Sequence, residues 1–331
     1  MSAEKNPVKV LITRDFPEVA IELLIREGFV VTTSLYDRLW PQQELIDVAK
    51  DHNALLCTIT EKIDARFLNA CNHLDVISQY AVGYDNIDID EATRLNIPIG
   101  YTPDVLTEAT ADIAFALMLA TSRKLLFAHK LILTGEWDYF RPKRHLGIEL
   151  KKKTLGIFGL GRIGFAMAEK CKGAYQMNIL YCNRSPNPEA KKELGARRVS
   201  FEELLTESDV LSVHCSLNSE TRNKFNMKAF EQMKSTAIFI NTARGLIHQE
   251  DDLREALENG LIWGAGLDVT NPEPMRHDNP LLTMENVTIL PHMGSSTTEA
   301  RNAMSQIAAM NIIEFYRNGR MPHCINEKVL S

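Results

Sequence analysis

The stretch that most constrains the fold is Thr154-Leu-Gly-Ile-Phe-Gly-Leu-Gly-Arg-Ile-Gly164. Its apolar run predicts a buried strand, and a helical pattern follows the glycines. In such a turn Gly159 allows the tight bend, Gly161 lets the backbone approach a pyrophosphate, and Gly164 lets helix and strand pack closely. The phosphates would bind at the helix N-terminus, where N–H groups and the positive end of the dipole lie. Because another strand is expected at Asn178–Tyr181, we predict a dinucleotide site rather than a bare structural turn.

Length and composition set the class of protein. A chain of 331 residues is too long for one typical core, so two domains are expected. A content of 45% apolar and 24% charged residues is that of an ordinary globular protein. The net charge of -6 argues against nucleic acid as a partner. The start of the chain has no apolar signal core, and the longest apolar run, Ile113–Ala120, is too short to span a bilayer, so no membrane association is expected.

The six cysteines carry no sign of a metal site. They form no C-x-x-C pair and no spacing typical of metal ligands. We therefore expect reduced, mostly buried thiols, no bound metal and a cytoplasmic location.

Residues 8–100 alternate between short β-rich runs and helical patterns. The strands are expected at 8–12, 30–33, 54–58 and 76–78, and the helices at 17–27, 41–50 and 65–70. This alternation predicts a parallel sheet with helices on both faces. The unit ends in the glycine-containing loop Gln79–Asp88, at the carboxyl end of a strand, where open α/β sheets bind ligands. The N–H groups of Val82 and Gly83 can hold an anion such as a carboxylate there, although an ordinary βα turn explains the spacing equally well.

The alternation of strands and helices stops at Thr102-Pro103-Asp104, which we interpret as a crossing between domains. One long helix is expected from about Val105 to Leu133, ended by Gly135. Its apolar residues cover more than one face, which favours burial against both domains or against a second subunit. The aromatic segment Glu136–Phe140, which contains Trp137, is interpreted as a dimer contact, a lid or plain packing.

A second α/β domain follows. Its strands after the glycine motif are expected at 178–181, 210–214, 237–241, 264–267 and 287–290, and Ser200-Phe-Glu-Glu203 is a capping box that opens a helix. A final amphipathic helix, about 297–317, is expected to return to the first domain. The predicted fold class is thus α/β, with two doubly wound parallel-sheet domains and a cleft between them. A flavodoxin-like substrate domain comprises residues 1–104 plus 293–331, and a Rossmann dinucleotide domain comprises 105–292.

The end of the second Rossmann strand bears on the choice of dinucleotide. An NAD site usually presents Asp or Glu there to the ribose hydroxyls. This chain has Tyr181-Cys-Asn-Arg-Ser-Pro186 instead. Arg184, with Asn183 and Ser185, can bind a 2′-phosphate that a carboxylate would repel. This favours NADP(H), with NAD(H) as the alternative if Arg184 is a solvated side chain beside a tolerant site.

Three polar residues follow strands of the second domain and should share the carboxyl edge with the glycine loop. Their types suit hydride transfer to a ketone. His292 is suited to protonate the carbonyl oxygen, since imidazole exchanges protons near neutral pH. Arg244 can hold a carboxylate through two hydrogen bonds, and Glu273 can stabilise a protonated histidine. Singly each has a structural explanation: a core histidine, a surface ion pair, an exposed proline-rich turn. Their joint placement favours the catalytic interpretation.

Over essentially the whole chain the sequence resembles the D-isomer-specific 2-hydroxyacid dehydrogenase family. The motifs that carry the resemblance are Gly159-Leu-Gly-Arg-Ile-Gly164, Asn241-Thr-Ala-Arg-Gly245, Gly264-Ala-Gly-Leu-Asp-Val-Thr-Asn-Pro-Glu-Pro274 and Leu290-Pro-His-Met-Gly-Ser295. Within the family it is most similar to glyoxylate/hydroxypyruvate reductases, with 2-ketogluconate reductases close behind.

The resemblance implies roles for individual residues. Arg244, Glu273 and His292 would form the catalytic trio, and the amides of Val82 and Gly83 would bind the substrate carboxylate together with Arg244. The implied cofactor contacts are Thr110, Gly159, Gly161, Arg162, Ile163, Gly164, Asn183, Arg184, Ser185, Ser216, Thr242, Asp268 and Gly294. In animal glyoxylate reductases the segment around Trp137 reaches the partner subunit's active site. Its neighbours Tyr139, Phe140, Arg141 and Arg144 differ here, which leaves the preferred size of the substrate open.

The expected activity is reduction of glyoxylate or hydroxypyruvate to a D-2-hydroxy acid by an NADPH-preferring homodimer. Two enzyme alternatives remain, a 2-ketogluconate reductase and a 3-phosphoglycerate dehydrogenase. The second of these would use basic residues such as Arg141, Lys143 and Arg144. From a different class, the same fold serves as a dinucleotide-sensing corepressor. The short ends of the chain and its intact trio weigh against that alternative.

Overall fold

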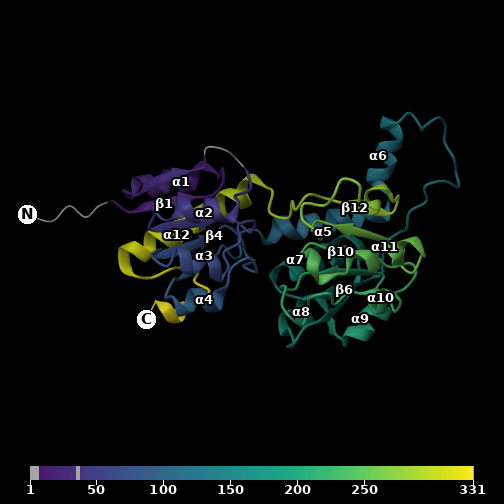
Figure 1. Ribbon diagram of the computed structural model, residues 1–331. Helices are drawn as coiled ribbons and strands as arrows, with labels where there is room; N and C mark the ends of the chain where they lie inside the picture. The colour runs from purple at the N-terminus through teal and green to yellow at the C-terminus, as the bar shows by residue number, and fades with distance from the viewer. Residues whose placement is uncertain (1–6, 35–37, 331) are drawn as a thin grey trace, which may run out of the picture. The chain divides into compact units, whose positions relative to one another are not determined.

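The computed structural model describes residues 7–34 and 38–330. These residues divide into two compact units. One runs up to Leu106 and includes the chain from Ser296 onward, and the other is Thr107–Ser295. The chain passes from one unit to the other within three residues of the boundaries that the sequence suggested. Each unit is built around its own parallel sheet (Figure 1).

The sheet of the first unit has the strand order β2-β1-β3-β4-β5, and every pair is parallel. This is the flavodoxin-like doubly wound order. The strands are β1 Lys9–Ile12, β2 Val30–Thr33, β3 Ala54–Cys57, β4 Val76–Gln79 and β5 Ile99–Gly100. The helices are α1 Glu18–Arg26, α2 Gln42–Ala49, α3 Ala65–Ala70, α4 Ile89–Arg94 and α12 Thr298–Asn318, followed by the 3-10 turn η3 Glu327–Val329.

Burial explains the elements of the first unit. Strands β3 and β4 are buried along their whole length, as expected for strands covered on both faces. The last helix, α12, packs against α1 and β4. Its N-cap Thr297 accepts a hydrogen bond from the Ala300 N–H, and it ends at Gly319 in the left-handed conformation. The short elements α4 and β5 were not anticipated from the sequence, because they are too brief to show a period.

The second unit has a seven-stranded parallel sheet in the order β12-β11-β10-β9-β6-β7-β8. Its strands are β6 Thr154–Phe158, β7 Asn178–Cys182, β8 Arg197–Arg198, β9 Val210–Val213, β10 Ile238–Asn241, β11 Gly264–Leu267 and β12 Val287–Ile289. Its helices are α5 Thr107–Ser122, α6 Leu125–Leu133, α7 Arg162–Tyr175, α8 Pro188–Leu194, α9 Phe201–Glu207, α10 Met227–Phe230 and α11 Glu250–Glu258, with the 3-10 turns η1 Gly245–Ile247 and η2 Pro280–Thr283. Counted from β6, this is the Rossmann order extended by one strand, and it reverses between β6 and β9.

The single long helix expected over 105–133 is wrong. The structure has two helices, α5 and α6, separated at Lys124, whose φ is +53°. The Lys124 ammonium lies 2.5 Å from the Glu285 carboxylate and 5.6 Å from the centre of the Trp263 ring. These tertiary contacts hold the break in a stretch whose local sequence favours helix throughout.

Helix α6 and the loop after it form an arm, which we define as residues 123–147. The chain returns from the arm beside its starting point, because the Ile148 N–H donates to the Ser122 carbonyl at 2.9 Å. Figure 1 shows α6 and this loop projecting from the rest of the second unit. None of the α6 residues is buried. The arm therefore exposes apolar side chains that no other part of its unit covers.

Two smaller expectations are confirmed. The capping box at Ser200 and Glu203 is present in both directions at the start of α9. All six cysteines are free, four of them buried and two half-buried. No helix in the described part of the chain is long and apolar enough to cross a membrane.

Candidate active site

The glycine loop joins β6 to α7 as the motif predicts. Gly159 has a φ of +95°, and a Cβ built on it would lie 2.6 Å from the Cys215 N atom, so only glycine fits this turn. A Cβ on Gly164 would lie 2.8 Å from the Gly159 carbonyl oxygen, which confirms the close packing of helix on strand. A Cβ on Gly161, the N-cap of α7, would meet no atom within 4 Å.

These features fit a dinucleotide pyrophosphate. The space in front of Gly161 leaves its backbone accessible, and the first turn of α7 contains no acidic residue that would repel phosphate. Arg162 and Ile163, the predicted pyrophosphate contacts, are the first two residues of this turn. Helix N-termini bind phosphates because their first N–H groups have no partner within the helix.

Asn183 ties the end of β7 to the glycine loop. Its side-chain oxygen accepts a hydrogen bond from the Leu160 N–H at 2.6 Å, and its amide donates to the Leu160 carbonyl at 3.2 Å. Both ends of the amide are thus engaged with the loop. Asn183, predicted as a cofactor contact, holds in place the loop that would meet the cofactor.

Arg184 and Ser185 are exposed on the turn after β7. A second arginine reaches this turn from β8. The Arg198 guanidinium donates to the Asn183 carbonyl at 2.9 Å and to the Arg184 carbonyl at 2.7 Å. Reasoning from the sequence missed Arg198, because the pairing of β8 with β7 that places it was not expected. Positive charge thus gathers at this turn.

The same positive charge affects the pKa of a nearby thiol, that of Cys182. Burial raises the pKa of Cys182, while the positive charges of Lys224 and Arg198 act in the opposite direction. Lys224 lies 4.3 Å from the centre of the Phe201 ring, at the start of the neighbouring helix α9. The end of β7 is therefore flanked by cations from two further segments of the chain.

The strands next to the switch point contribute Ser216 and Thr242. Ser216 lies in the loop after β9, directly after Cys215, whose backbone touches Gly159. Thr242 is almost buried after β10, and its hydroxyl lies 3.4 Å from Nδ1 of His214. Burial lowers the pKa of His214 to about 4, so this histidine is neutral at physiological pH. The neutral His214 ring therefore links the ends of β9 and β10 through its contact with Thr242.

Thr110, Asp268 and Gly294 form one buried group, although they are far apart in the sequence. The Asp268 carboxylate accepts hydrogen bonds from the N–H groups of Met293 and Gly294, each at 2.7 Å. The Thr110 hydroxyl donates to the Gly294 carbonyl at 3.0 Å. Burial raises the pKa of Asp268, and the two N–H bonds and the charge of His292 oppose that rise. Asp268 thereby fixes the loop that carries His292.

His292 and Glu273 meet at the same edge. Nδ1 of His292 lies 2.5 Å from Oε1 of Glu273. His292 has a φ of +54°, and its N–H donates to the Asp268 carbonyl at 2.9 Å. The side chains of His292 and Glu273 are 29% and 39% exposed, so a small molecule can reach the imidazole. With Nδ1 engaged by the carboxylate, Nε2 is the nitrogen left to exchange a proton with a substrate.

Arg244 is presented by a turn that packs beside the Glu273 loop. The buried Asn241 side chain shapes the turn, accepting from the Ala243 N–H at 3.0 Å and donating to the Arg244 carbonyl at 2.9 Å. A Cβ on Gly245 would lie 1.9 Å from the Thr270 carbonyl oxygen, so the turn lies directly against the loop after β11. Sequence reasoning missed Asn241 as a positioning residue, although it opens the Asn241–Gly245 motif.

Two further predicted groups come from other segments of the chain. Val82 and Gly83 belong to the first unit, in the loop after β4. Trp137 lies on the arm and is 70% exposed. Within the described residues no group of three or more His, Cys, Asp or Glu side chains could hold a metal ion. The carboxyl edge of the second sheet thus brings together a histidine–carboxylate pair, an arginine turn and a dinucleotide loop.

Comparison with known proteins gives a consistent picture. Residues 115–294 match the family described as D-isomer specific 2-hydroxyacid dehydrogenase, NAD binding domain. The chain is 44% identical over 326 residues to a glyoxylate reductase of Pyrococcus furiosus, covering 97% of this chain and 96% of the relative. Its fold is similar to the crystal structure of a protein from Thermus thermophilus, with a TM-score of 0.89 and 36% identity over 96% of this chain and 100% of that one.

A further solved structure carries ligands. It is an NADPH-dependent glyoxylate/hydroxypyruvate reductase from Sinorhizobium meliloti, in complex with NADP and malonate. The TM-score is 0.84 at 29% identity, covering 97% of this chain and 98% of that one.

Proposed function

We propose that this chain, which belongs to the D-isomer specific 2-hydroxyacid dehydrogenase family and is an oxidoreductase that binds a nicotinamide dinucleotide, reduces small 2-keto acids to D-2-hydroxy acids. The observation that carries the proposal is the 2.5 Å contact between His292 and Glu273, beside the turn that presents Arg244. Relatives named glyoxylate reductase, about as long as this chain, support glyoxylate as a substrate. The solved glyoxylate/hydroxypyruvate reductase with a similar fold supports hydroxypyruvate as another.

His292 is the proposed general acid. Reduction of the keto carbon places negative charge on its oxygen, and Nε2 of His292 neutralises it by donating a proton. The ionised Glu273 at Nδ1 stabilises the protonated imidazole beforehand and keeps its ring in one orientation. A bound reduced nicotinamide supplies the hydride. The hydride and the proton together convert the ketone into the alcohol.

Arg244 is the proposed anchor for the substrate. Its guanidinium can bind the carboxylate through two parallel hydrogen bonds and can polarise the adjacent carbonyl. The amides of Val82 and Gly83 are proposed to bind the same carboxylate, as the family resemblance implies. Asp268 acts through the loop that it fixes, by holding the backbone of His292, Met293 and Gly294.

We also propose a preference for NADPH over NADH. Arg184 is exposed at the end of β7, and Arg198 adds its charge to the same turn. No acidic residue occurs in 181–188, so nothing there repels a 2′-phosphate. The Sinorhizobium meliloti reductase, which contains NADP, supports this preference by similarity.

The arm is the proposed contact of a homodimer. Its exposed apolar side chains include Leu125, Leu126, Ile132, Leu133, Trp137, Tyr139, Phe140 and Leu146, with exposures from 44% to 84%. A cluster of this kind usually marks an interface, because water contact with so much apolar surface is unfavourable. Size-exclusion chromatography with light scattering tests this, and we expect a dimer that Leu133→Asp converts to monomers. A monomeric wild-type protein would contradict the proposed dimer.

Steady-state oxidation of NADPH with candidate keto acids tests the proposed activity. Glyoxylate and hydroxypyruvate should be the best substrates, ahead of 2-ketogluconate, and 3-phosphoglycerate should not be oxidised when NADP⁺ is supplied. Arg141 is already paired with Asp138, which weighs against a basic cluster reserved for a phosphate. A preference for 2-ketogluconate would keep the mechanism and change the substrate. Turnover far below about 1 s⁻¹ with every substrate, despite tight NADPH binding, would support the dinucleotide-sensing alternative.

A further inference from the structure

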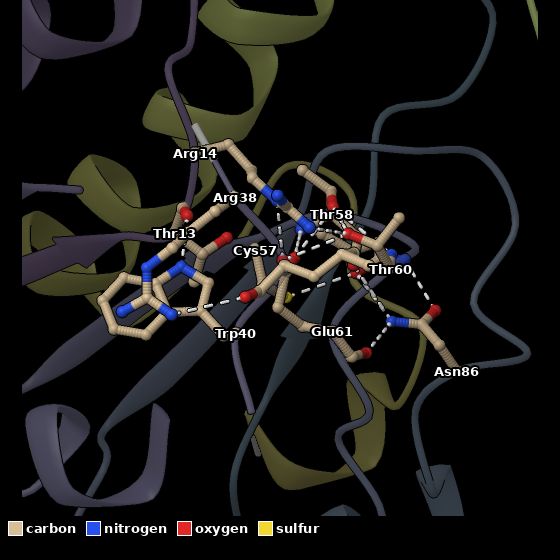
Figure 2. A network of polar contacts seen from close by, with 11 residues as sticks. Thr13, Arg14, Arg38, Trp40, Cys57, Thr58, Thr60, Glu61 and Asn86 are labelled. Atoms are coloured by element: carbon tan, nitrogen blue, oxygen red, sulfur yellow. Dashed lines mark hydrogen bonds and ion pairs between the residues drawn. The ribbon is translucent and has the colours of Figure 1, made fainter. Parts of the chain in front are cut away.

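A buried carboxylate lies at the carboxyl edge of the first sheet. Glu61 follows β3, and only 3% of its surface is exposed. Its two oxygens accept hydrogen bonds from four donors: the Arg14 Nε at 3.0 Å, the Thr58 N–H at 2.7 Å, the Thr58 hydroxyl at 2.8 Å and the Thr60 hydroxyl at 3.1 Å. Figure 2 shows these groups converging on Glu61. The carboxylate thus closes residues 58–61 into one rigid turn.

Arg14 supplies the opposite charge. It follows β1, and its guanidinium also donates to the Thr60 hydroxyl at 2.7 Å. The side chains of Arg14 and Glu61 are 13% and 1% exposed. A buried ion pair contributes little net stability, because desolvation offsets the attraction between the charges. Its presence at a ligand-binding edge therefore favours a role in geometry over one in stability alone.

The turn that Glu61 closes holds Asn86. The Asn86 amide donates to the Thr58 carbonyl at 3.1 Å and to the Glu61 carbonyl at 2.9 Å. Its side-chain oxygen accepts from the buried Gln79 amide at 2.7 Å. Asn86 thereby links the turn after β3 to the end of β4. The loop of residues 80–86 lies between these two anchors.

Gln79 connects this network to Gly83 by a hydrogen bond. Its Nε2 donates to the Gly83 carbonyl at 3.2 Å, and its Oε1 accepts from the Cys57 thiol at 3.2 Å. Burial raises the pKa of Cys57 well above its usual range, and the charge of Glu61 adds to the rise, so the thiol stays protonated and can donate. The donor and acceptor ends of Gln79 are thus assigned, and the peptide after Gly83 has one orientation.

The amides that this network surrounds lack partners of their own. Among the hydrogen bonds of the described residues, none is donated by the Val82 or the Gly83 N–H, whereas the flanking Tyr80 N–H donates to the Cys57 carbonyl at 2.8 Å. Both residues are half-buried. Two successive N–H groups held this way form a concavity for an anion. Because the network has already ordered the loop, ligand binding loses no further conformational entropy in ordering these two amides.

We propose that Glu61, paired with Arg14 and linked through Asn86 and Gln79, is a positioning residue that holds the Val82 and Gly83 amides for the substrate carboxylate. This inference rests on the proposed function, because it takes the anion to be the carboxylate of a 2-keto acid. Glu61 itself does not touch the substrate. The network should strengthen the binding of substrate and of transition state equally. Its loss should therefore raise KM and leave kcat unchanged.

Two variants test the network. Glu61→Gln keeps the size of the side chain but turns an NH₂ group toward donors, and Asn86→Ala removes the link between the two loops. We expect each to raise the KM for glyoxylate about tenfold or more, with kcat and the KM for NADPH within about threefold of wild type. The dissociation constant of oxalate, measured calorimetrically on the protein loaded with NADP⁺, should rise in parallel.

Asp209→Asn is the matched control. The Asp209 carboxylate also accepts one backbone N–H, from Thr154 at 2.8 Å, and pairs with one cation, Lys234, at 3.0 Å. It lies at the amino ends of β6 and β9, in the second unit. Because this carboxylate is purely structural, its substitution should lower the Tm and leave the KM for glyoxylate unchanged.

The outcomes separate this inference from the proposed function. Folded Glu61→Gln and Asn86→Ala proteins with wild-type KM and oxalate affinity would overturn the inference while leaving the reductase intact. An equal rise in KM in Asp209→Asn would also overturn it. If Glu61→Gln does not fold, Asn86→Ala and Arg14→Lys decide by the same measurements. A wild-type protein that reduces no 2-keto acid would remove the proposed function, and oxalate binding to the variants would still decide the role of Glu61.

Discussion

Nδ1 of His292 and Oε1 of Glu273 lie 2.5 Å apart, although 19 residues separate them in the chain. The pair exists because β11 and β12 are parallel neighbours, so the loops after them leave the same edge of the sheet. Asp268 fixes the backbone of the His292 loop, and the Gly245 turn packs against the loop of Glu273. The positions of His292, Glu273 and the Arg244 turn are therefore set by the backbone of three adjacent strands.

Replacement of Glu273 by Gln should lower kcat with glyoxylate by about tenfold or more, since a neutral amide does not stabilise a protonated imidazole. The KM for NADPH should not change. The measurement is steady-state kinetics at saturating NADPH. The control is Glu258→Gln, because Glu258 pairs with Arg254 on the exposed face of α11. Unchanged turnover in Glu273→Gln would show that the pair is structural.

Replacement of Arg184 by Ala should raise the KM for NADPH about tenfold to a hundredfold and leave that for NADH nearly unchanged, because a charge-assisted bond to the 2′-phosphate is lost. Arg197→Ala is the matched control. Arg197 is a neighbouring exposed arginine that pairs with Glu207, and it should affect neither cofactor. Equal effects of Arg184→Ala on both cofactors would refute the phosphate contact.

Helix α7 offers two glycines with opposite expectations. Gly164→Ala should lower both the Tm and the affinity for NADPH, because its Cβ would lie 2.8 Å from the Gly159 carbonyl oxygen and push the loop away. Gly173→Ala should stabilise the protein by about 0.5–1 kcal/mol, since a Cβ there meets no atom within 4 Å and alanine favours helix. Thermal melts and NADPH titrations of both proteins check this. Similar Tm changes in the two variants would contradict the packing argument.

His248 should make the protein sensitive to acid. It is fully buried, burial lowers its pKa to about 4, and the Asn241 amide lies 3.0 Å from its Nδ1. The unfolded chain takes up this proton below about pH 6.5, whereas the folded chain does so only near pH 4. The contribution is complete above pH 6.5 and is lost as the pH falls toward 4, by about 2 kcal/mol at pH 5.

Urea unfolding at about pH 7.5 and about pH 5 measures this dependence. The free energy of unfolding of His248→Gln should fall less between the two pH values than that of the wild-type protein. His277→Gln, at an exposed position, should keep the wild-type dependence. An undiminished pH dependence in His248→Gln would assign the acid sensitivity to other groups.

Much of the fold follows from local sequence. Buried β-rich runs marked most of the strands to within a residue or two of their ends, and the capping box at Ser200 marked a helix start. The break at Lys124 did not follow, because it depends on Glu285 and Trp263, which are more than a hundred residues away. The elements β5 and β8 have two residues each, too few to show a pattern.

The candidate site divides in the same way. Arg244, Glu273 and His292 could be selected from sequence, because each follows a strand and parallel strands share their carboxyl edge. Residues that hold other parts of the candidate site could not. Arg198 reaches the Arg184 turn because β8 pairs with β7, and Glu61 accepts a hydrogen bond from Arg14, 47 positions away in the sequence. Such contacts depend on the order of the strands, which a single sequence does not display.

The most direct test of the central claim is the kcat of His292→Asn with NADPH and glyoxylate, measured beside wild type and His277→Asn. Loss of the general acid should lower kcat by about 10²–10⁴-fold, with NADPH still bound and the Tm close to wild type. His277→Asn should behave as wild type, because that side chain is exposed and is not part of the trio. A His292→Asn protein that retains full turnover would contradict the mechanism and the function proposed from it.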